Sequence, residues 1–303
     1  MRRGSAPRWI AFAAVASGIA VVVGCIASGA APTRSSPPTA SRPVTAAEGA
    51  LLDRAEQLLL RACMRRAGFR YWIVSSQDQA PAGPGGPYVL GDPSWARRHG
   101  YGTDLRVQQD RAARKDPNTR YFAGLPPVRQ RAALVALNGP GPEGLQATLP
   151  NGIHVQHSSR GCASTAQRQL YGDLATWYRV SKLAENLPGE RYGLVVSDPA
   201  FTADVTAWSA CMRQRGHRVG SPADARRRFA DPAAAPSRAK EVAMAVDEAR
   251  CATSTGLAVT AARLDARYAA VQRRRYRSEL LERERLQRAA LPRAQALANQ
   301  PPE

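Results

Sequence analysis

The chain has 303 residues, of which 43 are Lys or Arg and 24 are Asp or Glu, so its formal net charge at pH 7 is +19. This length is sufficient for one large domain or two modest ones with hydrophobic cores, and the charge favours anionic partners and disfavours cationic ones. Only Lys115, Lys182 and Lys240 are lysines. Such an arginine bias beside abundant alanine is typical of a GC-rich genome, so the excess alone defines no site.

The first 24 residues have the layout of an export signal. Arg2, Arg3 and Arg8 precede the uncharged segment Ile10 to Val23. This apolar core of roughly fourteen residues is shorter than the ~20 that a membrane-spanning helix needs. We therefore expect residues 1–24 to be a signal peptide.

Cys25 follows this core in a motif that resembles a bacterial lipobox: Val22, Val23, Gly24 and the cysteine. The resemblance implies that a diacylglycerol is joined to Cys25 by a thioether and that the mature chain begins there, held durably on the membrane. Loss of the three arginines upstream takes the net charge from +19 to +16. The alternatives are an ordinary cleavable signal and an uncleaved anchor, in both of which Cys25 is incidental.

Four further cysteines, Cys63, Cys162, Cys211 and Cys251, are an even number in a compartment that would be oxidising. We expect them to form two disulfides. The rival interpretation is a zinc site, but no two of them show the short separation of structural zinc ligands, and none has the spacing of a redox-active dithiol.

An internal repeat suggests how these cysteines pair. "ACMRRAGFR", residues 62–70, and "ACMRQRGHR", residues 210–218, agree at six of nine positions, and "CASTA" from Cys162 loosely matches "CATST" from Cys251. Two diverged copies of one unit would pair Cys63 with Cys162 and Cys211 with Cys251, one of the three connectivities that four cysteines allow. The alternative is coincidence in an Ala- and Arg-rich chain.

The periodicity and turn signals predict an all-α body with long Pro/Gly-rich loops and at most one short β-hairpin. Residues 25–45 would be a lipidated, disordered tether, 46–190 a first helical unit with a long loop insertion, and 191–303 a second unit ending in a long C-terminal helix. Helices are expected from Ala46 to a stop at Gly68, before Gly100, over Pro126 to Leu137, from Cys162 to about Glu185, after Asp198 and Ser221, and from Pro236 almost to the end. A hairpin is expected around Asn151-Gly152. Leu257, Leu264, Tyr268 and Val271 mark one apolar face. This face ends where "QRRRYRSELLERER", residues 272–285, begins, and we expect that stretch to project into solvent or to pack weakly.

The search for catalytic or metal-binding motifs finds little. Ser237 and Lys240 fit S-x-x-K but lack the K-T-G element and the sheet of penicillin-binding enzymes, so we interpret Ser237 as part of a helix's first turn. His154 and His157 lack a third ligand. Trp95, Tyr101, Trp177, Tyr178 and Trp208 could line a glycan or peptide groove, but in a helical protein we expect core anchors. We expect neither a cofactor nor a metal.

The densest basic cluster is Arg273, Arg274, Arg275 and Arg277. It could contact anionic lipids at roughly 1 kcal/mol per side chain near the surface. The interpretation we favour is a solvated helix with ion pairs such as Glu279 with Arg283.

Together, the lipobox, the paired "CM…G" helices and the "GC…LYGD" stretch, Gly161 to Asp173, resemble exported lipoproteins of Gram-positive actinobacteria that have no assigned activity. The resemblance implies an extracytoplasmic, lipid-anchored location at the cell membrane and a disulfide-braced helical body, and it transfers no catalytic residue. We expect a binding or scaffold protein that faces the cell wall and recognises a peptide, a protein or an anionic envelope polymer; the compartment disfavours nucleic acid. The alternative is an envelope enzyme of an unfamiliar all-α type, with the loop from Ser75 to Gly102 as a lid.

Overall fold

The computed structural model describes residues 42–74, 87–231 and 235–300, and within these ranges the fold is all-α with a single two-stranded sheet. The fold class expected from the sequence is confirmed. The export signal, Cys25 and the tether up to residue 41 lie outside the described residues, as do residues 75–86 of the loop expected as a lid. No helix within the described ranges has the length and apolar character needed to cross a bilayer.

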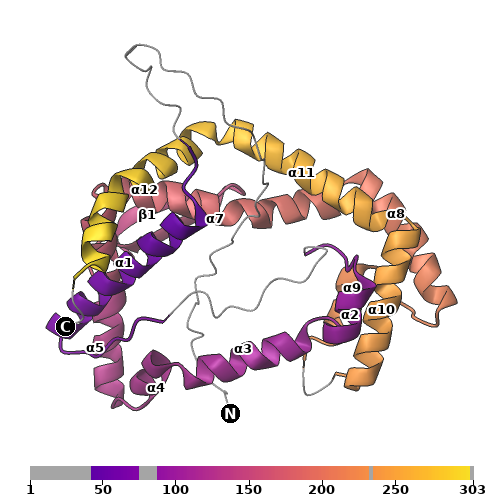
Figure 1. Ribbon diagram of the computed structural model, residues 1–303, viewed down its shortest axis with the longest axis horizontal. Helices are drawn as coiled ribbons and strands as arrows, with labels where there is room; N and C mark the ends of the chain where they lie inside the picture. The colour runs from indigo at the N-terminus through magenta and orange to yellow at the C-terminus, as the bar shows by residue number, and fades with distance from the viewer. Residues whose placement is uncertain (1–41, 75–86, 232–234, 301–303) are drawn as a thin grey trace, which may run out of the picture.

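Figure 1 shows the helices of the described ranges, which are joined by short connections except between α1 and α2 and between α5 and α6. They are α1 (Ala46–Arg66), α2 (Pro93–His99), α3 (Thr103–Lys115), α4 (Pro117–Ala123), α5 (Pro127–Asn138), α6 (Cys162–Tyr171), α7 (Leu174–Val196), α8 (Pro199–Gln214), α9 (Pro222–Arg227), α10 (Arg238–Ser254), α11 (Leu257–Arg275) and α12 (Arg277–Ala298). The strands are β1 (Gly144–Thr148) and β2 (His154–Ser158).

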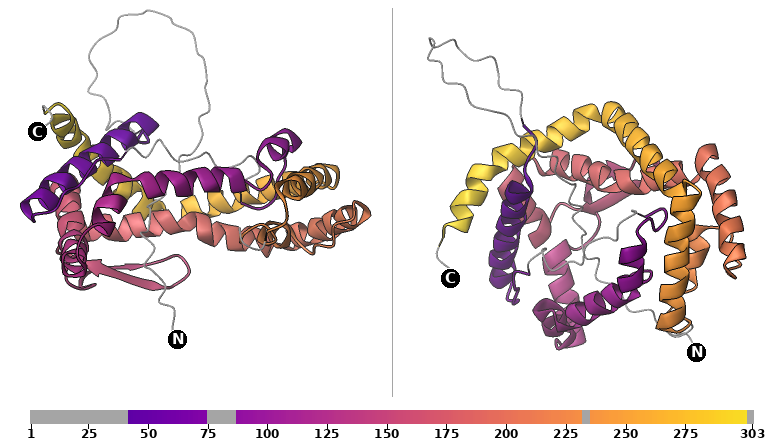
Figure 2. Two further views of the ribbon diagram at one scale, coloured as in Figure 1. Left: turned by 90° about the horizontal axis from the view of Figure 1, so that it is seen from below. Right: turned by 45° about the vertical axis from the view of Figure 1, so that its right-hand side comes forward.

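The hydrophobic core is divided between two ends of the molecule. In what we call the first lobe, α1, α5, α6, α12 and the start of α7 share buried side chains. In the second lobe, α8, α10, α11, the end of α7 and residues 88–90 do the same. The long helix α7 runs from one lobe to the other (Figures 1 and 2).

These lobes do not follow the two segments expected from the sequence. The expected boundary between Glu190 and Arg191 falls inside α7. Residues 88–90, from the first segment, are buried in the second lobe, whereas α12, from the second segment, packs in the first. Each segment therefore contributes to both cores.

Helix α1 begins and ends at residues that its sequence marks. Thr45 and Glu48 form a capping box, in which each side chain accepts a hydrogen bond from the other's backbone N–H. The helix then buries Leu52 and Ala55 in a cluster with side chains of α12. Gly68, at φ 80°, allows the turn that ends it.

The expectation that residues 272–285 project into solvent or pack weakly is wrong, because Gln272 and Tyr276 are buried and Tyr276 packs with Leu183 and Leu187 of α7. Leu286, Ala290 and Ala294 of α12 are buried against α1, and Val271 itself is 40% exposed. Alanines bury little area each, so the apolar face of α12 is weak in the sequence, yet their small size lets two helices approach closely.

Two long helices expected from the sequence are divided, and one continues further than expected. Gly172, at φ 81°, separates α6 from α7, and Gly256, at φ 80°, separates α10 from α11. Conversely, α7 continues past Glu185 and through Pro188 to Val196. Proline removes one helical hydrogen bond, and the burial of Leu183 and Leu187, both just before Pro188, offsets the loss.

The expected hairpin around Asn151-Gly152 is confirmed. Its strands pair antiparallel, with Gln146 opposite Gln156, and its turn contains Gly152 at φ 84°. Leu145 and Ala147 face Leu174 and Tyr178, so the hairpin lies on α7. Alternation along β1 thus buries one side of the sheet and exposes the other.

Candidate functional site

The first disulfide joins Cys63, in the last turn of α1, to Cys162, the first residue of α6, with their Cα atoms 5.5 Å apart. Beyond it, α1 ends in a Schellman motif. The N–H of Phe69 donates to the carbonyl of Met64, and that of Gly68 donates to the carbonyl of Arg65, both at 2.9 Å. Arg129 of α5 closes this helix end: its guanidinium donates to the carbonyl of Gly68 at 2.8 Å and lies over the ring of Phe69.

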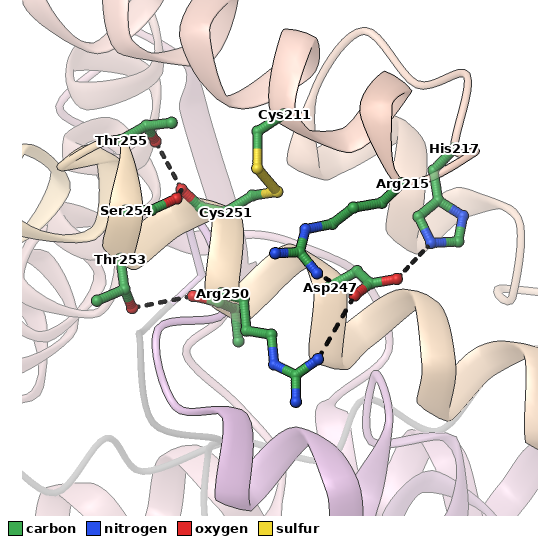
Figure 3. Close-up of a disulfide and its surroundings, with 10 residues drawn as sticks. Cys211, Arg215, His217, Asp247, Arg250, Cys251, Thr253, Ser254 and Thr255 are labelled. Atoms are coloured by element: carbon green, nitrogen blue, oxygen red, sulfur yellow. Dashed lines mark hydrogen bonds and ion pairs between the residues drawn. A yellow bond between two sulfur atoms is a disulfide. The ribbon is translucent and has the colours of Figure 1, made fainter.

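The second disulfide joins Cys211 of α8 to Cys251 of α10, with Cα atoms 5.8 Å apart (Figure 3). The pairing expected from the sequence repeat is thus confirmed for both bridges. Helix α8 ends as α1 does: the N–H of His217 donates to the carbonyl of Met212, and that of Gly216 to the carbonyl of Arg213, both at 2.9 Å. The repeated "CM…G" motif is therefore a helix ending. The "CASTA" and "CATST" matches differ, because the first opens α6 and the second closes α10.

Asp247, one turn before Cys251, gathers positive side chains beside the second bridge. Its carboxylate lies 3.0 Å from the Arg215 guanidinium, 3.0 Å from Nε2 of His217 and 4.0 Å from the Arg250 guanidinium (Figure 3). This cluster ties the end of α8 to α10 independently of the sulfur atoms. Its negative charge is therefore already matched within the protein.

Glu248, the next residue on α10, faces the core and is completely buried. One carboxylate oxygen accepts the N–H of Leu90 at 3.0 Å, and the other accepts the hydroxyl of Tyr101 at 2.8 Å. The Arg226 guanidinium lies 3.9 Å away. Burial raises the pKa of Glu248 to about 7, against the opposing effect of Arg226 and of the two hydrogen bonds.

Glu241 lies two turns earlier on the same face of α10 and is also buried. It accepts the N–H of Tyr101 at 2.8 Å and the hydroxyl of Thr103, and it pairs with Arg238 at 3.0 Å. Gly100, at φ 57°, packs so closely that a Cβ atom there would lie 2.7 Å from a Glu241 oxygen. The two carboxylates therefore hold residues 90–103 on α10.

This buried acidic pair was not predicted from the sequence. A signal was present, since Glu241 and Glu248 are seven residues apart, in register with the buried side chains of Met244, Ala245, Ala249 and Ala252. Acids on the apolar face of a helix require partners. Here Arg238 and Arg226 are near in the sequence, but the other partners, Leu90, Tyr101 and Thr103, are 138 to 158 residues away and are not revealed by α10 alone.

In the enzyme hypothesis, the loop from Ser75 to Gly102 was expected to be a lid. Its described part, residues 87–102, instead packs against the second lobe. Tyr88, Val89 and Leu90 are buried in the second lobe, and α2 packs on α10. Arg226 also donates to the carbonyl of Pro87. This part of the loop is thus packed on the second lobe through its buried apolar side chains.

The arginine corner, which we define as Arg273, Arg274, Arg275 and Arg277, lies where α11 meets α12. All four side chains are exposed, and no carboxylate of the described residues pairs with them. Arg275 lies over the ring of Tyr276, 5.2 Å from its centroid. The expected pair between Glu279 and Arg283 is absent from this part of the chain: Arg283 lies over Trp177, and Glu279 accepts a hydrogen bond from Ser278.

The remaining residues that the sequence suggested as catalytic, metal-binding or groove-lining do not form a common site. Ser237 is the N-cap residue of α10. His154 contacts Thr148 at 3.0 Å while His157 stacks on Tyr178, and the described residues contain no group of three or more metal-ligating side chains. Trp177, Tyr178 and Trp208 are buried core anchors, and Trp95 and Tyr101 pack against the core between α2 and α10.

A groove lies at the end of α8, on the second "CM…G" motif. It has a volume of about 680 Å³ and is lined by Ser209, Arg213, Gly216, Arg218, Val219 and Gly220. A smaller hollow of about 420 Å³ lies over the hairpin and Arg179. No known protein family, curated protein or solved structure matches the chain.

Proposed function

We propose that the protein is an exported lipoprotein, anchored through Cys25 to the outer face of the cytoplasmic membrane, with a binding or scaffold role facing the cell wall. The observation that carries this proposal is the state of the cysteines. Cys63, Cys162, Cys211 and Cys251 are all joined in disulfides, the state typical of an oxidising compartment. Cys25 is the one cysteine of the sequence outside these pairs, at the position where the lipobox resemblance requires a free thiol.

The position of residue 42 supports the same arrangement. The Arg288 guanidinium donates to the carbonyl of Arg42 at 2.6 Å, so the described chain begins against α12 (Figure 1). Arg288 is eleven residues after Arg277, the start of α12, which corresponds to about 17 Å along a helix. The sixteen residues between Cys25 and Arg42 can span at most roughly 55 Å. A lipid on Cys25 and the arginine corner could therefore reach one membrane surface.

The chemistry of the arginine corner suits that surface. Its four exposed guanidinium groups have no carboxylate partners among the described residues. Each basic side chain near an anionic leaflet contributes about 1 kcal/mol to the free energy of binding to the membrane. Anionic lipid head groups or other envelope polyanions are the partners that this charge would attract within about 8 Å, the screening length at physiological ionic strength.

The buried carboxylates favour a structural role for their site. Both oxygens of Glu248 and both oxygens of Glu241 accept hydrogen bonds or ion pairs from the protein itself. A general acid or base needs to reach a substrate proton, whereas these groups hold residues 90–103. This supports binding or scaffolding rather than catalysis as the function of the body.

Replacement of the anchoring residue tests the proposal. Cys25→Ala should move the protein from the membrane to the soluble fraction or leave it as an uncut precursor, because the thioether acceptor is gone. Intact-mass measurement of the wild type should give a chain that begins at Cys25 and carries diacylglycerol. Normal processing and unchanged membrane partition of Cys25→Ala would overturn lipidation.

The Cys25→Ala variant also allows the contribution of the arginine corner to membrane binding to be measured without the lipid anchor. Cys25→Ala should bind phosphatidylglycerol vesicles in a salt-sensitive way, and adding Arg274→Gln with Arg275→Gln should weaken that binding about tenfold or more. Arg111→Gln with Arg114→Gln, on exposed positions of α3, removes the same charge elsewhere. Equal losses in the two pairs would show that net charge, not the corner, carries the attraction.

A further inference from the structure

The groove at the end of α8 is a candidate binding site distinct from the arginine corner. Its walls are the last turns of α8 and the loop 216–220, and its volume of about 680 Å³ lies within the range of small-molecule sites. Two of its six lining residues are arginines and none is acidic. The groove is therefore positively charged and open to solvent.

Arg213 is held in place over this groove. Its guanidinium donates to the hydroxyl of Ser209 at 3.1 Å, and that hydroxyl donates to the carbonyl of Val219 at 2.7 Å. Because Ser209 is buried, this short chain of hydrogen bonds fixes one edge of the guanidinium to the floor of the groove. Most of its N–H donors remain for a ligand.

Arg218 lies on the loop that forms the opposite wall. Its side chain is exposed and makes no hydrogen bond or ion pair with the described residues, although its carbonyl accepts a hydrogen bond from Arg228. The carboxylates of Asp224 and Asp247 already have partners: Asp224, which lies beside Gly220, pairs with Arg227, and Asp247 pairs with Arg215 and His217. The positive charge of the groove is thus not neutralised from within.

The first copy of the motif shows that folding does not require an open, charged groove. There, Arg70 occupies the position of Arg218 and lies 5.9 Å from the ring centroid of Trp72. Arg129 covers the corresponding turn by donating to the carbonyl of Gly68. The same helix ending is closed in one lobe and open in the other.

We propose that the groove of Arg213 and Arg218 binds a phosphate group carried by an ester. A guanidinium can donate two parallel N–H bonds to two oxygens of one phosphate, a geometry that a single ammonium cannot supply. Two guanidinium groups that line one groove would match the charge of a phosphomonoester dianion, and they would also attract the single charge of a phosphodiester. The source is a soluble phosphate ester or a lipid head group.

Calorimetric titration at constant ionic strength tests the soluble source. Glycerol 3-phosphate is titrated into the full-length protein in a neutral detergent. Arg213→Ala with Arg218→Ala should raise Kd at least tenfold, because two charge-assisted hydrogen-bonding groups are lost. Arg65→Ala with Arg70→Ala, the same positions of the first motif, is the charge-matched control and should leave Kd within twofold.

A second arm uses phosphatidylglycerol vesicles with the same variants in a Cys25→Ala background. Selective weakening by the groove pair in either arm supports the site, and the arm in which it occurs identifies the source. Arg218→Lys guards against misfolding, since it keeps the charge but removes the planar fork and should still weaken binding. Equal effects of the two double variants in both arms, or no binding by the unmodified groove in either arm, would overturn the proposal. Because glycerol phosphate binding does not require a lipid on Cys25, failure here is distinguishable from failure of the anchor.

Discussion

The two lobes contain the same helix ending in two different settings. In the first lobe, the Schellman motif after Cys63 is covered by Arg129, and the bridge leads to the first residue of α6. In the second, the motif after Cys211 borders an open groove, and the bridge leads to the last turn of α10, beside Asp247. A local sequence motif thus determines how a helix stops, whereas the surrounding elements determine what its end is used for.

Removing each disulfide in turn should have the largest effect on the free energy of unfolding, and it compares the two lobes directly. Loop-closure entropy predicts a loss of about 4.7 kcal/mol for Cys63 with Cys162, separated by 99 residues, and about 3.9 kcal/mol for Cys211 with Cys251, separated by 40. The paired Cys→Ala variants should show this order in guanidinium unfolding. A clearly larger loss from the second pair would mean that local packing, rather than loop length, sets the cost.

Glu248 gives the second lobe a pH dependence. Its pKa is raised from 4.5 to about 7 in the folded state, so folding favours the protonated form. Its contribution to the free energy of unfolding is therefore complete below about pH 4.5 and is lost as the pH rises through about 7. At about 1.4 kcal/mol per pKa unit, the total loss is roughly 3 kcal/mol. Glu248→Gln should remove this part of the pH dependence of unfolding.

A second variant distinguishes titration of Glu248 from a general loss of packing. Tyr101→Phe removes a hydroxyl that donates to the carboxylate and lowers its pKa. The midpoint of the pH-dependent loss should then move to higher pH, whereas Glu248→Gln should abolish it. If Glu248→Gln and the wild type lose stability in parallel from pH 4.5 to 8, the carboxyl is not the titrating group.

The two glycines of the repeated motif test whether the helix endings are equivalent. Gly68 and Gly216 have φ values of 80° and 84°, which cost a residue with a Cβ atom about 1–2 kcal/mol. Gly68→Ala and Gly216→Ala should therefore destabilise by similar amounts in thermal unfolding. Gly49→Ala, inside α1 where a Cβ meets nothing within 4 Å, should instead stabilise by about 0.5–1 kcal/mol. A neutral Gly216→Ala would show that α8 does not end in the left-handed turn.

Local signals in the sequence predicted much of this fold. Asp198-Pro199 and Ser221-Pro222 open α8 and α9, and Gly68 follows the end of α1. These features act within a few residues, so a single segment contains the whole cause. The repeat likewise predicted the pairing of the cysteines, because it related two distant positions through a shared pattern.

Apart from the disulfides, the features that depend on distant partners were not predicted. The passage of α7 through Pro188 and the burial of α12 depend on side chains supplied by other helices. Glu248 meets Leu90 and Tyr101 across 158 and 147 residues, and neither partner has a sequence signal of its own. The groove was not predicted either. It depends on Arg218 having no side-chain partner among the described residues, and no local sequence pattern indicates this.

The smallest expected effect separates an arginine used for folding from one left for a ligand. Arg129→Ala removes a hydrogen bond to the carbonyl of Gly68 and a cation–π contact with Phe69, and for an exposed side chain should cost about 0.5–1 kcal/mol in unfolding. Arg218→Ala removes no hydrogen bond, ion pair or ring contact of the side chain within the described residues and should leave stability within about 0.5 kcal/mol. Because Arg218 forms no such contact, its loss should be felt in phosphate-ester binding instead. A loss from Arg218→Ala as large as that from Arg129→Ala would mean that both arginines serve the helix ending, and the difference between the lobes would be one of geometry alone.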